Sequence, residues 1–105
     1  NQIGKIVSED SKNHSNFNVA SLLDGNTRSY PIRYSTLING GVPDTVENYP
    51  MNDFLYVAYG QNKQGLYNVA TWEVVSLKPF TIGSTWNLGD NIYLYRLDRI
   101  KTKNE

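Results

Sequence analysis

The sequence predicts an all-β domain, mainly antiparallel, that closes fully or partly into a small barrel. Its 8 tyrosines and 2 tryptophans, with many valines and isoleucines, favour strands, and its asparagines and glycines favour the turns between them. Residues 35–52 form a long connection between the predicted third and fourth strands, where an OB-like Greek-key barrel also has one. The OB-like layout is therefore favoured, with an SH3-like barrel or a small sandwich as alternatives.

A β-hairpin centred on Asp24-Gly25 is the strongest local signal. Asp-Gly between two alternating runs is typical of a type I′ turn, which needs positive φ at both central residues. This turn places apolar residues on one face of the hairpin, namely Phe17, Val19, Leu23, Tyr30, Ile32 and Tyr34. A four-residue loop keeps the same parity and stays an alternative, whereas a three-residue loop would split the apolar set.

The other predicted strands follow from apolar runs between turn residues. They are residues 2–8, 54–59, 66–77 and 92–100, and residues 80–88 are predicted to be either a short strand or an irregular segment. Gly4 is a candidate bulge or close-approach site. The continuous apolar run 54–59 indicates burial on both faces, and 66–77 is the longest strand candidate. Residues 89–91 are predicted to be a turn.

The long connection 35–52 contains glycines and prolines, and we expect its apolar residues to hold it against the domain. These are Leu37, Ile38, Val42, Val46 and Tyr49. The length of 105 residues indicates a single β-barrel domain over residues 1–105, and the charged end 101–105 is predicted to be a frayed tail.

Composition excludes several classes of function. Ten basic and ten acidic residues give a net charge of zero, which argues against affinity based on a broad basic field. The absence of cysteine excludes disulfides, thiolate metal sites and cysteine catalysis. No run of about 18 apolar residues is present, so the sequence contains no membrane-spanning helix.

Catalytic and cofactor motifs are not recognisable. The single histidine, His14, lies in a polar stretch and is interpreted as a solvated loop residue. The aspartates fall at predicted turns and strand starts, where Asp bonds its own backbone. No nucleophile elbow or phosphate loop occurs. We therefore expect no enzyme activity, no metal and no cofactor.

Aromatic residues are the best candidates for a binding surface, because they exceed what one small core readily covers. Aromatic rings stack on sugars or bases and anchor protein partners, and nearby arginines can add positive charge. The candidate binding residues are Tyr67, Trp72, Trp86, Tyr93, Tyr95, Arg96 and Arg99.

These features together predict a non-catalytic interaction or assembly domain. A protein partner is favoured over a glycan, and a glycan over nucleic acid, because the chain is neutral. The alternative is an OB-like module that binds oligosaccharide or single-stranded nucleic acid through an aromatic face. The chain begins at Asn1, so we expect it to belong to a larger exported or membrane-anchored protein, which favours an extracytoplasmic or cell-envelope location.

Overall fold

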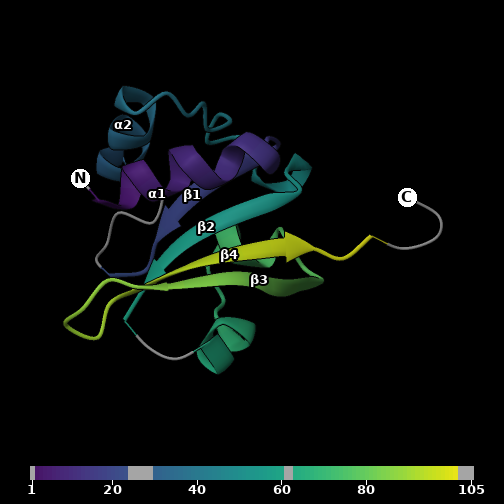
Figure 1. The fold of residues 1–105 in the computed structure, drawn as a ribbon. Coiled ribbons are helices and arrows are strands. Elements are labelled where there is room, and N and C mark those ends of the chain that lie inside the picture. The colour runs from purple at the N-terminus through teal and green to yellow at the C-terminus, as the bar shows by residue number, and fades with distance from the viewer. Residues whose placement is uncertain (1, 24–29, 61–62, 102–105) are drawn as a thin grey trace.

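The computed structural model describes residues 2–23, 30–60 and 63–101. Over these ranges the chain forms a mixed sheet with helical segments on both sides (Figure 1). In chain order the elements are α1 (Gln2–Asp10), η1 (Ser11–Asn13), β1 (Phe17–Ser21), α2 (Tyr30–Ile38), η2 (Tyr49–Met51), β2 (Phe54–Tyr59), η3 (Lys63–Asn68), α3 (Trp72–Val75), β3 (Phe80–Asn87) and β4 (Tyr93–Arg99).

The sheet is open and has the strand order β1-β2-β4-β3 over the described residues. β1 pairs with β2 in parallel, while β2 with β4 and β3 with β4 pair antiparallel. The prediction of a β-rich fold is confirmed in part. The predicted closure into a barrel does not occur among the described residues, because β1 and β3 lie at opposite edges of the sheet.

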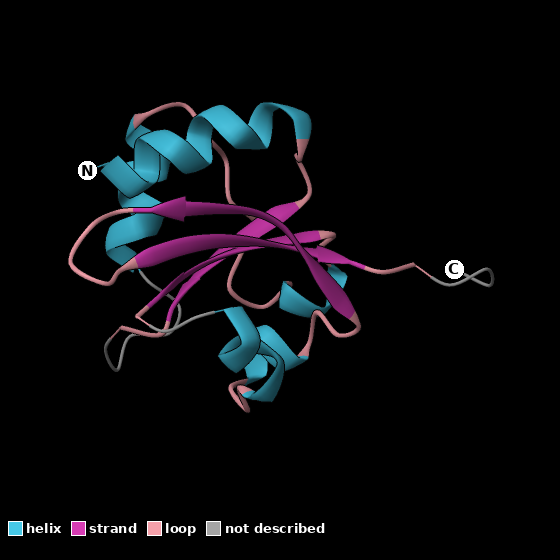
Figure 2. Ribbon diagram, turned by 60° about the horizontal axis from the view of Figure 1, so that its bottom comes forward, coloured by secondary structure: helices cyan, strands magenta, loops and turns pink. Residues whose placement is uncertain are grey.

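Each face of the sheet has its own hydrophobic core. Figure 2 shows the helices above and below the strands. On one face α1 and α2 contribute Val7 and Ile32, which pack with Val19 and Leu94. On the other face the short helical segments contribute Tyr49, Leu66 and Val74, and the turn after α3 contributes Leu77, to a core that includes Val57 and Leu97. Both faces are covered, so the fold has three layers.

The predicted hairpin is wrong in its second strand, because residues 30–38 form the helix α2. The turn at Asp24-Gly25 lies outside the described residues. Pro31 suits the first turn of a helix, where a missing N–H breaks no hydrogen bond. Parallel pairing of β1 with β2 also requires a crossover connection rather than a tight turn. The helix supplies part of that crossover.

Two other predicted strands are helical. Residues 2–10 form α1, whose Ile3, Ile6 and Val7 pack against the sheet at helical spacing. Residues 66–77, predicted to be the longest strand, contain part of η3 and all of α3. Aromatic and β-branched composition suggested strands in both places, but tertiary packing overrode that preference.

The remaining strand predictions are confirmed. β2 is buried on both faces, and β3 and β4 fall within 80–88 and 92–100. The turn at 89–91 has positive φ at Gly89, Asp90 and Asn91. Gly4 is a close-approach site as predicted, although it lies on a helix. A Cβ there would overlap the Ser35 side chain and lie 2.6 Å from its carbonyl carbon.

A buried polar network fixes the long connection against the edge strand β1. Arg33 of α2 donates to the Asn18 side chain, to the Asp44 carbonyl at 2.7 Å and to the Tyr49 hydroxyl at 2.7 Å. The Tyr49 hydroxyl donates to the Val19 carbonyl at 2.6 Å. Side chains therefore occupy hydrogen-bonding groups on the open edge of β1, which blunts its tendency to pair with another strand.

The contact between α1 and α2 gives the first prediction. Gly4→Val should lower the free energy of unfolding by about 1–3 kcal/mol, because the new side chain forces the two helices apart. Denaturant unfolding measures the change. Lys5→Val is the matched control, since Lys5 is exposed on the same helix and should shift stability by no more than about 0.5 kcal/mol. Equal effects of the two substitutions would contradict the close approach.

Candidate functional site

The exposed face of α2 is apolar, and its buried face is largely polar. Four residues at helical spacing are 53–69% exposed: Tyr30 (54%), Tyr34 (69%), Leu37 (53%) and Ile38 (67%). Arg33, Ser35 and Thr36, by contrast, are buried on the inner side of the helix. A surface helix normally has the opposite polarity. We call the four exposed residues the α2 stripe.

The α2 stripe has no charged residue. Arg33 is the only ionisable group of α2 besides its tyrosines, and it is directed into the polar network described above. Beyond the helix Val42 is also exposed, at 73%. Leu37, Ile38 and Val42 were predicted to pack the long connection against the domain, and that prediction is wrong. Contiguous exposed apolar surface of this kind is typical of an interaction site.

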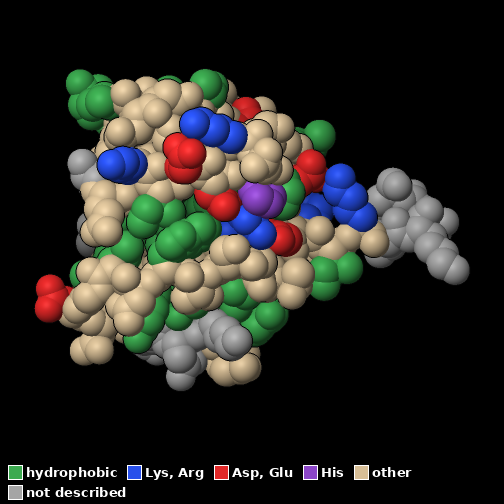
Figure 3. Space-filling view, in the orientation of Figure 1, with side chains coloured by type: hydrophobic (Ala, Val, Ile, Leu, Met, Phe, Trp, Pro, Cys, Tyr) green, Lys and Arg blue, Asp and Glu red, His purple; other side chains and the backbone are tan. Residues whose placement is uncertain are grey.

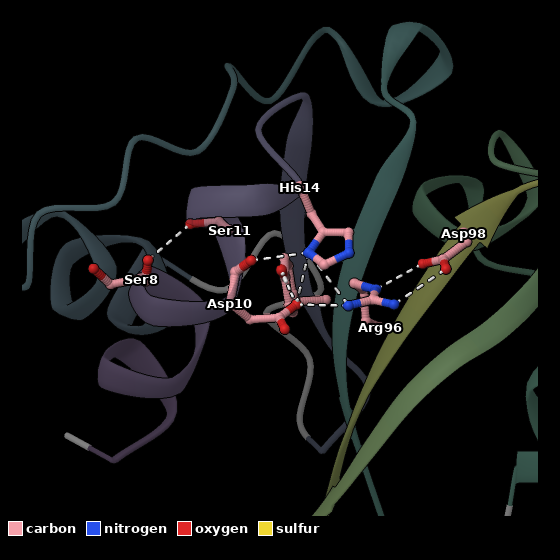
Figure 4. A network of polar contacts seen from close by, with 7 residues as sticks. Ser8, Asp10, Ser11, His14, Arg96 and Asp98 are labelled. Carbon is pink, nitrogen blue, oxygen red and sulfur yellow. Dashed lines mark hydrogen bonds and ion pairs between the residues drawn. The ribbon is translucent and has the colours of Figure 1, made fainter.

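A second feature is a group of charged and polar side chains between α1 and β4, which we call the ionic cluster and which Figure 4 shows from close by. Arg96 donates to Asp10 Oδ2 at 2.9 Å and to Asp98 Oδ1 at 2.8 Å. The Tyr56 hydroxyl donates to the same Asp10 oxygen at 2.6 Å. His14 Nδ1 lies 2.9 Å from the Asp10 carbonyl and 3.3 Å from Asp10 Oδ2. The cluster ties the end of α1 to the sheet.

The position of His14 corrects its interpretation as a solvated loop residue. Its ring packs edge-on against Phe54 with centroids 4.9 Å apart, and its side chain is 24% exposed. The neighbouring Tyr56 and Ser11 hydroxyls do not lack partners, since Tyr56 donates to Asp10 and Ser11 donates to the carbonyl of Ser8. Nor does the described part of the chain gather three or more acidic or histidine side chains that could hold a metal ion.

The cluster shifts the pKa values of its members. Burial alone would raise the pKa of Asp10, but the hydrogen bonds from Tyr56 and Arg96 outweigh it and leave the pKa below its ordinary 3.8. Burial and the neighbouring Asp10 carboxylate raise the pKa of Tyr56 well above its usual range. The tyrosine therefore stays a neutral donor and the aspartate an ionised acceptor. Such an arrangement holds structure in place.

The structure divides the predicted binding residues between the two sides of the sheet. Trp86 and Arg96 belong to the α1 side, where Trp86 packs near Tyr56 with ring centroids 6.3 Å apart. Tyr93 and Tyr95 belong to the opposite core, and Tyr95 is only 2% exposed. The predicted residues therefore do not line a common groove.

The other predicted residues lie near the α3 side of the sheet or at its end. Tyr67 is exposed and stacks on Phe80 with centroids 5.1 Å apart, and Trp72 is exposed and contacts Tyr49 edge-on at 5.5 Å. Arg99 donates to the backbone carbonyls of Asn52 at 2.8 Å and Pro50 at 2.9 Å. Both arginines among the predicted binding residues, Arg96 and Arg99, therefore make hydrogen bonds within the fold.

The α2 stripe was not among the predicted sites. Its signal is present in the sequence as apolar residues at positions i, i+4, i+7 and i+8 from Tyr30 to Ile38. The hairpin interpretation of the same residues concealed it. The ionic cluster offered no such signal, because Asp10 and Arg96 are 86 positions apart in the chain.

Comparison of this chain with protein-family models, with curated proteins and with solved structures finds no match. Within the ranges that the structure describes, the helices are too short or too polar to cross a membrane.

The ionic cluster gives a prediction with a defined pH dependence. Asp10→Asn should lower the free energy of unfolding at neutral pH by about 1.5–3 kcal/mol, because hydrogen bonds to a charged acceptor are lost. The folded-state pKa of Asp10 is depressed, so its contribution is complete above the ordinary pKa of 3.8 and is lost as the pH falls through the folded value. The difference in free energy of unfolding between the unchanged chain and Asp10→Asn should therefore disappear in acid. Denaturant unfolding at several pH values measures this difference.

Glu9→Gln is the control for this experiment, since Glu9 is an exposed neighbour on the same helix whose side chain is 77% exposed. It should leave stability nearly unchanged across the same pH series. A stability gap for Asp10→Asn that stayed constant into acid would contradict the assigned role of the carboxylate.

Proposed function

We propose that this chain is a non-catalytic interaction domain that docks onto a protein partner through the α2 stripe. The observation that carries the proposal is the reversed polarity of α2, which exposes two tyrosines, a leucine and an isoleucine while burying an arginine. Tyrosine is enriched among the residues that contribute most to binding in protein interfaces, and the buried centre of such an interface is apolar.

The charge of the stripe supports a protein rather than a nucleic acid or a lipid surface. Nucleic acids and anionic membranes are held largely by lysine and arginine, and the α2 stripe presents neither. An apolar, uncharged patch on another protein complements it without leaving buried charges unpaired. The division of aromatic residues between the two sides of the sheet also gives no support to single-strand binding on one stacking face.

A photo-reactive amino acid in place of Tyr34 tests the proposal in cells of the source organism. We expect a cross-link to one protein of defined mass from position 34, and none from the same group placed at Val75, which is exposed on α3 on the other side of the sheet. Mass spectrometry identifies the partner, and sedimentation of the purified chain shows whether it is a second copy. Cross-linking to lipid alone, or equally from both positions, would overturn the proposal.

Charge substitutions in the stripe give the matched binding prediction. Leu37→Glu with Ile38→Glu should weaken binding of the identified partner about tenfold or more, because two charges would have to be desolvated in an apolar contact. Val75→Glu should leave the affinity unchanged. Circular dichroism melting should show that the two variants keep the fold, since all three positions are exposed.

A further inference from the structure

A groove of about 390 Å³ lies beside the ionic cluster, between the end of α1 and the strand β3. Its lining consists of Ile6, Glu9, Asp10, Asn13 and Trp86. On the face that Figure 3 shows, the histidine lies among charged side chains, and hydrophobic side chains gather next to them. None of the lining residues belongs to the α2 stripe, so the groove is a separate surface. Its size falls within the range of roughly 300–1,000 Å³ typical of ligand pockets.

The carboxylate of Asp10 is held in a fixed orientation with one oxygen left available. Tyr56 and Arg96 both donate to Oδ2, and His14 also lies beside this oxygen. Oδ1 accepts no hydrogen bond from the residues that the structure describes. A carboxylate that is already oriented loses little entropy when it accepts a bond from a ligand. The cluster therefore prepares one acceptor on the wall of the groove.

Trp86 supplies an apolar wall, and the other polar side chains supply further bonding groups. The Asn13 amide and the Trp86 indole N–H make no hydrogen bond to described residues, and Glu9 bonds only Lys12, at 3.2 Å. An aromatic ring combined with convergent acceptors and an amide matches a ligand that has apolar C–H faces and several hydroxyl groups. A sugar ring has both.

The charge balance of the groove distinguishes a neutral sugar from a cationic ligand. Each carboxylate on the groove already has a positive partner, because Arg96 lies 2.9 Å from Asp10 and is shared with Asp98 at 2.8 Å, and Lys12 lies 3.2 Å from Glu9. A cation bound at either carboxylate would compete with an ion pair that is already formed. A neutral polyhydroxyl ligand carries no such penalty.

We propose that this groove is a binding site for a neutral saccharide. The sugar ring packs on the indole of Trp86, one hydroxyl donates to Asp10 Oδ1 and another to Glu9, and the Asn13 amide bonds a third. The site does not depend on the proposed protein-docking function, because the two surfaces share no residue.

The test follows the two indole N–H signals in ¹H–¹⁵N NMR spectra of the chain. The probes are chito-, cello-, malto- and manno-oligosaccharides at about 10 mM, a concentration that saturates millimolar sites. We expect at least one probe to shift the Trp86 signal in a saturable way and to leave the Trp72 signal in place, since Trp72 lies on the other side of the sheet. Absence of a Trp86 shift with every probe would overturn the proposal.

Substitutions in the groove complete the test. Asn13→Ala and Glu9→Gln alter exposed positions and should keep the fold. Each should weaken binding of the oligosaccharide that shifts the Trp86 signal about tenfold. Glu47→Gln, at an exposed position outside the groove lining, should bind as the unchanged chain does. Unchanged affinity in both groove variants would overturn the assignment. A Trp86 shift with tetramethylammonium but with no sugar would assign the groove to cations instead.

Discussion

The parallel pairing of β1 with β2 is the constraint on which the rest of the fold depends. Parallel neighbours cannot be joined by a tight turn, so the chain must cross over the sheet between them. That crossover includes α2 and the long connection, and it sets the edge of the sheet at β1. Both faces of β2 are buried, which requires helical cover on each side. The three layers follow from this pairing.

The reversed polarity of α2 has two physical causes, one on each side of the helix. On the inner side Arg33 reaches the open edge of β1, where it bonds Asn18, Tyr49 and the Asp44 carbonyl. A buried arginine is tolerated because several acceptors surround it. On the outer side the apolar stripe gains nothing from the isolated fold. The protein contact that we propose would account for these exposed residues, so the same helix serves the fold on one side and the proposed function on the other.

The ionic cluster has a different role from the α2 stripe. Asp10, Arg96 and Tyr56 join α1 to β2 and β4, and α1 forms a wall of the groove opposite Trp86 of β3. These structural hydrogen bonds fix the orientation of the Asp10 carboxylate on that wall. The two surfaces are carried by two helices that pack together at Gly4 and Ser35, yet each can be altered by substitutions that leave the other intact.

The sequence by itself determined the strands at 17–21, 54–59, 80–87 and 93–99 and the turn at 89–91, because local apolar runs and turn residues specify these elements. The tertiary structure decided between helix and strand for residues 2–10 and 30–38, since these segments combine apolar residues at helical spacing with aromatic or β-branched residues that also suit strands. It likewise decided the pairing of Asp10 with Arg96, which lie 86 positions apart. Local preference does not reach that far along the chain, and only the folded packing brings such residues together.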